Sequence, residues 1–206
     1  MNKIVEVIIN LEIGSLIIAC LFITTLIILW IQSIIKKPRD VKIDGASIGL
    51  GTISFHICND KTDRQIAYKI LVEMKTRVVS VDIDYNEDII KSVNDSYYSF
   101  FQITRDLLKE MPIDKLPVSS DFVKMVMMFL NSVMRPYLTK WGLKFKNWYE
   151  NEERKEENKG ISPQELQKKY EHYDELINDL TILKNNVDGF AIELESFIFR
   201  KKKKCD

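Results

Sequence analysis

The sequence predicts a mainly helical protein, with one N-terminal transmembrane helix followed by a cytoplasmic antiparallel bundle of about four long helices and a short β element at its start. Three observations predict this fold. Residues 13–35 run for 23 positions without a charged side chain, one short segment alternates polar with apolar residues, and the remaining chain repeats apolar residues every three or four positions.

The uncharged segment from Ile13 to Ile35 is long enough, as a helix, to cross a membrane. At about 1.5 Å per residue it rises roughly 34 Å, and a hydrocarbon core is about 30 Å thick. A cleavable signal peptide and a buried core helix are the open alternatives, although a signal peptide needs a shorter apolar region and a small-residue cleavage site. The sequence therefore predicts a retained membrane span.

Basic residues indicate the orientation of this span. Lys36, Lys37 and Arg39 follow it, whereas only Lys3 precedes it. By the positive-inside rule, residues 1–12 are expected outside the cell and the C-terminal domain in the cytoplasm. Trp30 is expected at the membrane interface together with the three basic residues, and the lipid bilayer is an expected partner.

A polar linker at 36–46 is expected to lead into a helical domain at 47–199. At its start, Ile53, Phe55 and Ile57 alternate with polar residues, a pattern typical of a half-buried strand that forms a hairpin with the preceding "SIGLG". The first helix is then expected at about 61–79, with Asn59 or Asp60 as its cap.

Three further helices follow in the prediction. One begins at a capping box of Asp84 and Glu87 and ends at Pro112. The next begins at 119–121, and Pro136 either starts a new helix after it or kinks a continuous one. The last runs from Ser162 to about Phe199. Residues 200–206 form a polybasic tail, for which membrane association and a merely solvated end are both open.

The segment "MRPYLTKWGLKFKNWYE" (134–150) mixes aromatic with basic residues. At about 100° per residue, Tyr137, Trp141, Phe145 and Trp148 share one narrow stripe of a helix, whereas the basic residues spread around it. A nucleic-acid platform would place exposed aromatic rings and cations on one face. The four rings are therefore predicted to belong to the structural core, and nucleic acid is not an expected partner.

Three segments carry a resemblance to a known family. Residues 63–77, 93–112 and 134–150, the last with its Arg-Pro-aromatic-Leu-Thr-Lys-Trp run, resemble a family of mostly uncharacterised bacterial single-span membrane proteins. The resemblance covers about 60–180. It implies a helical domain anchored in the bacterial inner membrane, and it transfers no catalytic residue.

The chain offers no recognisable catalytic constellation. His56 and His172 have no cysteine or carboxylate at a ligand spacing, and the acidic residues within 82–88 match no known metal-binding loop. No phosphate-binding loop or nucleophile elbow occurs. We therefore expect no catalytic residue, metal or cofactor, and a non-enzymatic role is favoured.

Arg77, Arg105 and Arg135 are the candidate ligand-binding residues, because they line an anion site if the helices bring them together. A solvated or ion-paired surface is the alternative. The leading hypothesis is a membrane-anchored helical binding or interaction protein, either an oligomerising effector or an accessory protein of a bacterial defence or mobile-element system. Its expected partner is a protein or a second copy of the chain. The alternative hypothesis is a membrane-tethered enzyme or sensor acting on nucleotide or RNA.

Overall fold

A computed structural model of the chain describes residues 18–31, 40–58, 60–77, 79 and 82–199. The chain divides into two compact units, Met1–Pro38 and Arg39–Asp206.

The first unit contributes one described helix, residues 18–31. At about 1.5 Å per residue this helix rises roughly 21 Å, which is less than the thickness of about 30 Å of a hydrocarbon core. In the described parts of the chain, no helix is long and apolar enough to cross a membrane.

This finding makes the predicted transmembrane helix at 13–35 wrong, because the helix that is described is too short. The predicted single-pass inner-membrane location is corrected with it. The lipid partner and the interfacial role of Trp30 stay predictions. Residues 13–17 and 32–35 of that segment lie outside the described residues, as do Lys36, Lys37, Arg39 and the polybasic tail at 200–206.

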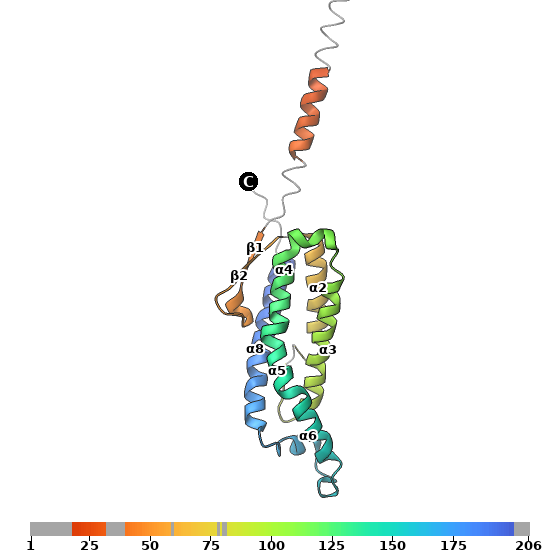
Figure 1. The fold of residues 1–206 in the computed structure, drawn as a ribbon, viewed down its shortest axis with the longest axis vertical. Coiled ribbons are helices and arrows are strands. Elements are labelled where there is room, and N and C mark those ends of the chain that lie inside the picture. Colours follow the sequence, from red (N-terminus) through yellow and green to blue (C-terminus); the bar gives the residue numbers. More distant parts are fainter. Residues whose placement is uncertain (1–17, 32–39, 59, 78, 80–81, 200–206) are drawn as a thin grey trace, which may run out of the picture. The chain divides into compact units, whose positions relative to one another are not determined.

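The second unit is a helical bundle with a small sheet (Figure 1). Short 3-10 turns lie between some of its described elements: η1 (Gly45–Ile48) between the two strands, and η3 (Ile113–Lys115) and η6 (Glu156–Asn158) between helices. The α-helices are α2 (Lys61–Lys75), α3 (Ile90–Lys109), α4 (Leu116–Met128), α5 (Arg135–Tyr137), α6 (Leu143–Glu153), α7 (Pro163–Gln167) and α8 (Tyr173–Phe199).

The sheet is a two-stranded antiparallel hairpin of β1 (Asp40–Asp44) and β2 (Ser54–Cys58). The buried side chains of Ile43 and Phe55 lie opposite each other in it, and β2 packs on α4. The strand predicted around Phe55 therefore exists, but Ile53 precedes it and is 40% exposed. Its partner comes from the segment predicted as a linker, because "SIGLG" is occupied by η1 and its turn.

The loop between the strands rests directly on α8. The Ser47 hydroxyl donates to Glu193 Oε1 at 2.9 Å, and Ile48 beside it is fully buried. A Cβ atom added to Gly189 would lie 1.8 Å from the carbonyl oxygen of Ser47. Position 189 must therefore be glycine for the hairpin loop to reach the helix.

The core is aromatic where the α4 helix and its continuation meet α8. The Phe122 and Phe197 rings stack with centroids 6.0 Å apart, and the Phe129 and Phe190 rings stack at 4.0 Å. All four side chains are fully buried. The earlier phenylalanine of α4 and its continuation packs on the later one of α8, and the later one on the earlier, so the two helices are antiparallel.

A helix begins where the sequence predicts only if its capping residue is adjacent to it in the chain. Asp60 caps α2 by accepting from the Thr62 N–H at 3.1 Å, as predicted. The capping box predicted at Asp84 is wrong, since Asp84 accepts from the Asn86 N–H within a turn and α3 begins later, at Ile90.

The first turn of α3 is capped instead by a distant glutamine. Gln167, at the end of α7, is fully buried and accepts from the Ile90 N–H at 2.9 Å through its Oε1 atom. Its Nε2 atom donates to the Asp88 carbonyl at 3.0 Å. One amide side chain thus fixes both the start of α3 and the turn before it.

The chain from Leu116 to Glu153 is one continuous helical run whose middle is widened into π-helix. The π segments are η4 (Phe129–Met134) and η5 (Leu138–Gly142), with α5 between them. Pro136 has no N–H to donate, and its ring would clash with the carbonyl four residues earlier in a regular α-helix. Of the two predictions for Pro136, the continuous helix is therefore the correct one. We call the whole stretch from Leu116 to Glu153 the α4–α6 run.

The last predicted helix is divided in two. Ser162 caps α7 as expected, by accepting from the Glu165 N–H at 3.2 Å, but α7 ends at Gln167 and α8 begins at Tyr173. The intervening Tyr170 ring packs 4.8 Å from the Trp148 ring. Burial of this ring in the aromatic cluster, a tertiary contact, outweighs local helix propensity here.

Candidate functional site

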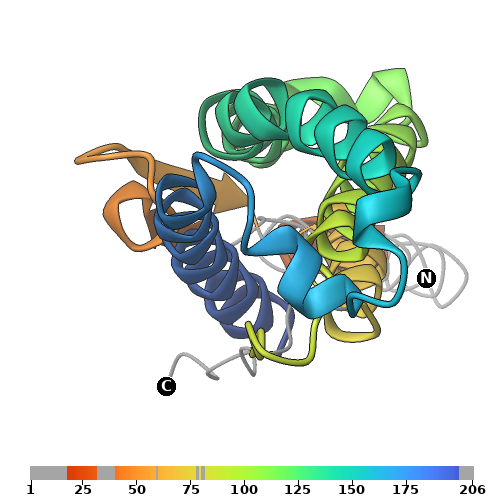
Figure 2. The same cartoon turned by 90° about the horizontal axis from the view of Figure 1, so that it is seen from below.

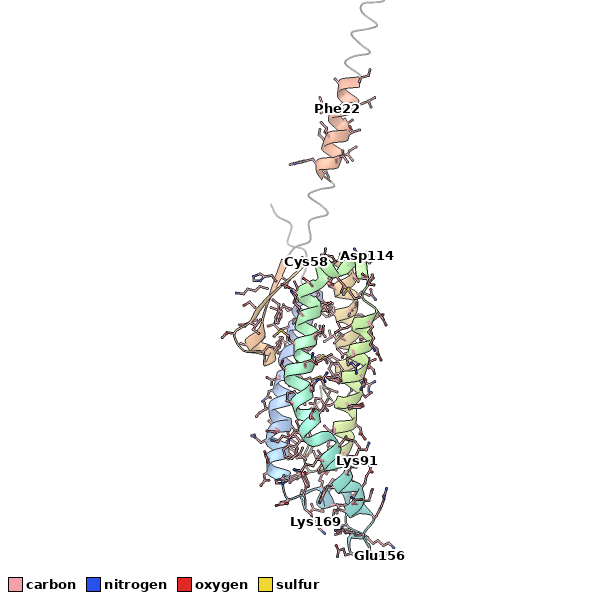
Figure 3. The ribbon with its side chains drawn as sticks, in the orientation of Figure 1. Phe22, Cys58, Lys91, Asp114, Glu156 and Lys169 are labelled. Atoms are coloured by element: carbon pink, nitrogen blue, oxygen red, sulfur yellow. The ribbon has the colours of Figure 1, made fainter. Side chains whose placement is uncertain are left out.

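A groove runs along the surface between α3 and the α4–α6 run. These two helices lie side by side and antiparallel (Figure 1), and Figure 2 shows the run passing over both α8 and α3. Lys91 of α3 pairs with Glu150 of α6 at 3.0 Å, and Figure 3 shows Lys91 at the lower end of the bundle, where α6 lies.

We call this hollow the α3 groove, and its cavity volume is about 500 Å³. A second hollow of about 320 Å³ continues it toward α4 and shares Phe101 and Arg135 with it. The lining residues of the α3 groove come from one stripe of each helix: Asn94, Asp95, Tyr98, Phe101, Arg135, Leu138, Thr139, Gly142, Leu143 and Lys146.

Both widened segments of the α4–α6 run border these hollows. Gly142 and Leu138 of η5 line the α3 groove, and Leu130 of η4 lines the second hollow. π-helical turns occur frequently at functional sites, because they shift side chains out of the regular helical register. A Cβ atom added to Gly142 would meet no atom within 4 Å, so the space above this residue is open.

Two of the three candidate arginines come together at the junction of the hollows. The guanidinium carbon of Arg135 lies 5.6 Å from the centroid of the Phe101 ring, and that of Arg105 lies 6.0 Å from it. In the described residues, neither arginine forms an ion pair with a carboxylate. Their positive charges are therefore available to a ligand.

Arg77 does not join them. Its Nε atom bonds Glu73 at 2.8 Å, and its Nη1 atom donates to the Ser99 hydroxyl at 3.2 Å. Ser99 is two residues from Phe101 on α3, so at about 100° per residue it lies on a different face of the helix. The three arginines do not form one site.

A buried amide lines the α3 groove with one donor unused. Asn94 is only 5% exposed, and its Oδ1 atom accepts from the Tyr137 hydroxyl at 2.7 Å. Burial raises the pKa of Tyr137 well above its usual value, so this hydroxyl keeps its proton. Among the described atoms, the Nδ2 atom of Asn94 has no hydrogen-bond partner.

Apart from Thr139, the rest of the groove lining is mostly apolar or internally paired. Tyr98 and Leu143 are large apolar side chains that remain 56% and 73% exposed at its rim. The Lys146 ammonium pairs with Asp95 at 3.2 Å, so these two charges offset each other. The α3 groove thus combines apolar walls with the uncompensated charge of Arg135.

The predicted aromatic stripe faces the interior of the bundle. Tyr137, Trp141 and Phe145 are buried, and Trp148 is partly buried against the same core. The Trp141 Nε1 atom donates to Asp179 at 2.9 Å. Rings packed in this way present no stacking platform to a nucleic acid.

Asp179 holds the Trp141 indole and the Lys140 ammonium together. Lys140 bonds Asp179 and Glu175 at 2.7 Å each and lies 4.6 Å from the centroid of the Trp141 ring. Hydrogen bonds from Lys140 and Trp141 lower the pKa of Asp179. This network fixes the start of α8 against the α4–α6 run.

Asp179→Ala is expected to lower the free energy of unfolding by about 2 kcal/mol, because the buried indole N–H of Trp141 loses its acceptor. Glu175→Ala is the matched control, since Glu175 is an exposed partner of Lys140 and His172, and its loss is expected to cost less than about 1 kcal/mol. Urea denaturation followed by circular dichroism measures both. Equal losses for the two variants would contradict the assignment to the indole.

The histidines and the acidic loop have structural surroundings. His56 is exposed on β2, and His172 packs with its ring centroid 6.4 Å from that of Trp141. In the acidic loop, Asp82 pairs with Lys184 at 3.1 Å, and Asp88 accepts from a backbone N–H. No group of three or more His, Cys, Asp or Glu in the described residues could hold a metal ion.

Sequence reasoning missed Asn94, Tyr98 and Gly142, which with Phe101 and Arg135 define the α3 groove. One signal was present: a proline and a glycine six residues apart, at 136 and 142, inside one predicted helix. Both residues disfavour regular α-helix, so together they indicate an irregular stretch.

Comparison of the chain with protein-family models, with curated proteins and with solved structures finds no match. The resemblance to single-span bacterial membrane proteins therefore stays a prediction.

Proposed function

We propose that this protein is a non-enzymatic binding protein whose ligand site is the α3 groove. The observation that supports this is the open cavity of about 500 Å³ at the place where the α4–α6 run widens into π-helix. Ligand pockets are usually about 300–1,000 Å³ and mostly apolar, with a few polar groups that orient the ligand.

The chemistry of the lining favours binding over catalysis. The residues that line the α3 groove include no histidine, cysteine or serine, and its one carboxylate, Asp95, is paired with Lys146. Their one threonine, Thr139, has no hydrogen bond to a base among the described residues. A nucleophile with an adjacent base, the usual requirement for covalent catalysis, is not found among these lining residues. The alternative, an enzyme or sensor acting on nucleotide or RNA, needed Arg77, Arg105 and Arg135 in one anion site. It loses this support, because Arg77 is paired with Glu73.

The wider roles expected from the sequence, an oligomerising effector or an accessory protein of a bacterial defence or mobile-element system, stay proposals. They require a protein partner or a second copy of the chain, and they are independent of the α3 groove. The mass of the purified protein in solution tests the oligomeric role directly.

Gly142→Trp is expected to weaken binding of a neutral fluorescent probe, N-phenyl-1-naphthylamine, at least tenfold while leaving the fold intact. The open space above Gly142 admits the indole into the groove without displacing the backbone. Fluorescence titration of the full chain measures probe binding, and circular dichroism checks the fold.

Ile192→Trp is the matched control, because Ile192 is exposed on α8, which contributes no residue to the groove lining. The apolar helix at 18–31 is common to all variants, so the difference between variants reports the groove. Unchanged probe binding by Gly142→Trp, or an equal loss in the control, would overturn the proposed function.

A further inference from the structure

We infer that the ligand of the α3 groove is a small amphipathic oxyanion, an apolar chain or ring that ends in a carboxylate or phosphate group. This inference rests on the proposed function and specifies the chemistry of the ligand at the same site.

Two groups without partners in this groove, the Asn94 amide nitrogen and the Arg135 guanidinium, can only donate hydrogen bonds. The Tyr137 hydroxyl occupies the Oδ1 atom of Asn94, so the unpartnered Nδ2 atom is left to donate. A guanidinium has only donors, and that of Arg135 has no carboxylate partner among the described residues. Arg135 is exposed, whereas the Asn94 Nδ2 atom is a buried donor without an acceptor, which is unfavourable and would be relieved by an oxygen of the ligand.

The charge of the groove selects an anion over a cation. Asp95 and Lys146 neutralise each other at 3.2 Å, which leaves the charge of Arg135 in excess. Arg105, whose guanidinium carbon lies 6.0 Å from the centroid of the Phe101 ring, adds a second positive charge where the two hollows join. Guanidinium groups bind carboxylate and phosphate oxygens through paired, charge-assisted hydrogen bonds.

The walls of the groove require an apolar part of the ligand. The rings of Tyr98 and Phe101 line it from α3, and Leu138 and Leu143 line it from the α4–α6 run. A simple inorganic anion would leave this apolar surface in contact with water. The limited volume favours a small molecule over a nucleic acid strand or a folded partner.

Three ligands with the same eight-carbon chain test this inference: octanoate, octyl phosphate and octanol. Each displaces N-phenyl-1-naphthylamine from the full chain in a fluorescence titration. At least one of the two anions is expected to displace the probe at a concentration at least tenfold below that of octanol. The order of the two anions shows whether the head group is a carboxylate or a phosphate.

Arg135→Gln is expected to reduce the preference for the anion over octanol to threefold or less and to leave displacement by octanol unchanged. Asn94→Ala is expected to reduce the same preference by a smaller factor. Arg154→Gln is the matched control, because Arg154 is exposed at the end of α6 and does not line the groove. The control is expected to keep the full preference.

The outcomes separate the inference from the proposed function. Equal displacement by octanol and by both anions overturns the inference and leaves the groove as a binding site. A full preference in Arg135→Gln overturns the inference as well, since the head group would then bind elsewhere. If none of the three compounds displaces the probe and Gly142→Trp does not affect its binding, the proposed function fails. Displacement by inorganic phosphate as strong as by octyl phosphate would overturn the apolar part of the inference.

Discussion

Gly189→Ala is expected to lower the free energy of unfolding by about 3 kcal/mol, although alanine is the better helix former by about 1 kcal/mol. The new methyl group would lie 1.8 Å from the carbonyl oxygen of Ser47, a backbone atom that no side-chain rotation can move. The hairpin loop must then lift from α8. Lifting it exposes the fully buried Ile48, which is worth about 1.5–3 kcal/mol, and breaks the bond from Ser47 to Glu193.

Gly142→Ala is the matched control, because both glycines lie in helical segments but the space above Gly142 is open. This substitution is expected to raise the free energy of unfolding by up to about 1 kcal/mol. Urea denaturation followed by circular dichroism measures both variants. Hydrogen exchange at the Leu50 N–H, which bonds the Gly45 carbonyl at 2.7 Å, reports whether the loop has lifted. A Gly189→Ala protein as stable as wild type would contradict the close approach of the loop.

Asp63→Asn is expected to stabilise the protein at neutral pH. Asp63 is fully buried in the first turn of α2, and neither of its carboxylate oxygens has a hydrogen-bond partner among the described residues. Burial raises the pKa of Asp63 to about 6 from its usual 3.8, and the charge of Asp60 adds to the rise. The neighbouring Ser119 hydroxyl, which forms no hydrogen bond of normal geometry with Asp63, and Lys115 oppose the rise without cancelling it.

The pH dependence follows from this pKa. Between pH 3.8 and 6 the folded protein retains a proton on Asp63 that the unfolded chain releases. Stability from the neutral acid is therefore complete below the unfolded pKa and is lost as the pH rises through the folded pKa, by about 3 kcal/mol in all. Asparagine is neutral throughout, so the variant and wild type are expected to be equally stable near pH 3.5 and to differ by about 3 kcal/mol near pH 7.

Urea denaturation at three pH values across this range measures the difference between Asp63→Asn and wild type. Asp60→Asn is the control, because the pKa of Asp60 is lowered overall. Burial raises this pKa, but hydrogen bonds from Thr62 and the charge of Lys115 together lower it by more. Its ionised form therefore stabilises the fold at neutral pH, and the control is expected to show the opposite pH trend. A pH-independent difference for Asp63→Asn would show that Asp63 has the same pKa in the folded and unfolded protein, and would contradict the raised pKa.

The parts of the fold that could be predicted from the sequence depend on neighbouring residues. The Asp60 cap, the strand around Phe55 and the aromatic stripe through Trp141 each follow from spacing over a few positions, which a local pattern captures. The continuous helix through Pro136 was one of two predicted alternatives, and the choice between them depended on whether the run could widen into π-helix.

Other features depend on contacts between distant segments. The division of the last helix at Tyr170 comes from packing against Trp148, and the partner strand of β2 comes from a segment that reads as a polar linker. The apolar stretch at 13–35 predicted a membrane span, but within the described residues no helix is long and apolar enough to cross a membrane.

Only part of the candidate site could be predicted. Charge alone selected Arg77, Arg105 and Arg135, but it could not show that Glu73 occupies Arg77 while the other two lie over Phe101. The unused donor of Asn94 was invisible in the sequence, because it depends on Tyr137 occupying the other atom of the same amide. Hydrogen-bond inventories of this kind require the three-dimensional arrangement.

The buried amide of Gln167 also constrains the order of events during synthesis. It completes the first turn of α3 from a position 77 residues further along the chain. When α3 leaves the ribosome, that turn has no acceptor for the Ile90 N–H, so its N-terminal end frays in the nascent polypeptide. The helix can become fully formed only after α7 has been translated, which makes completion of this bundle a late step in folding.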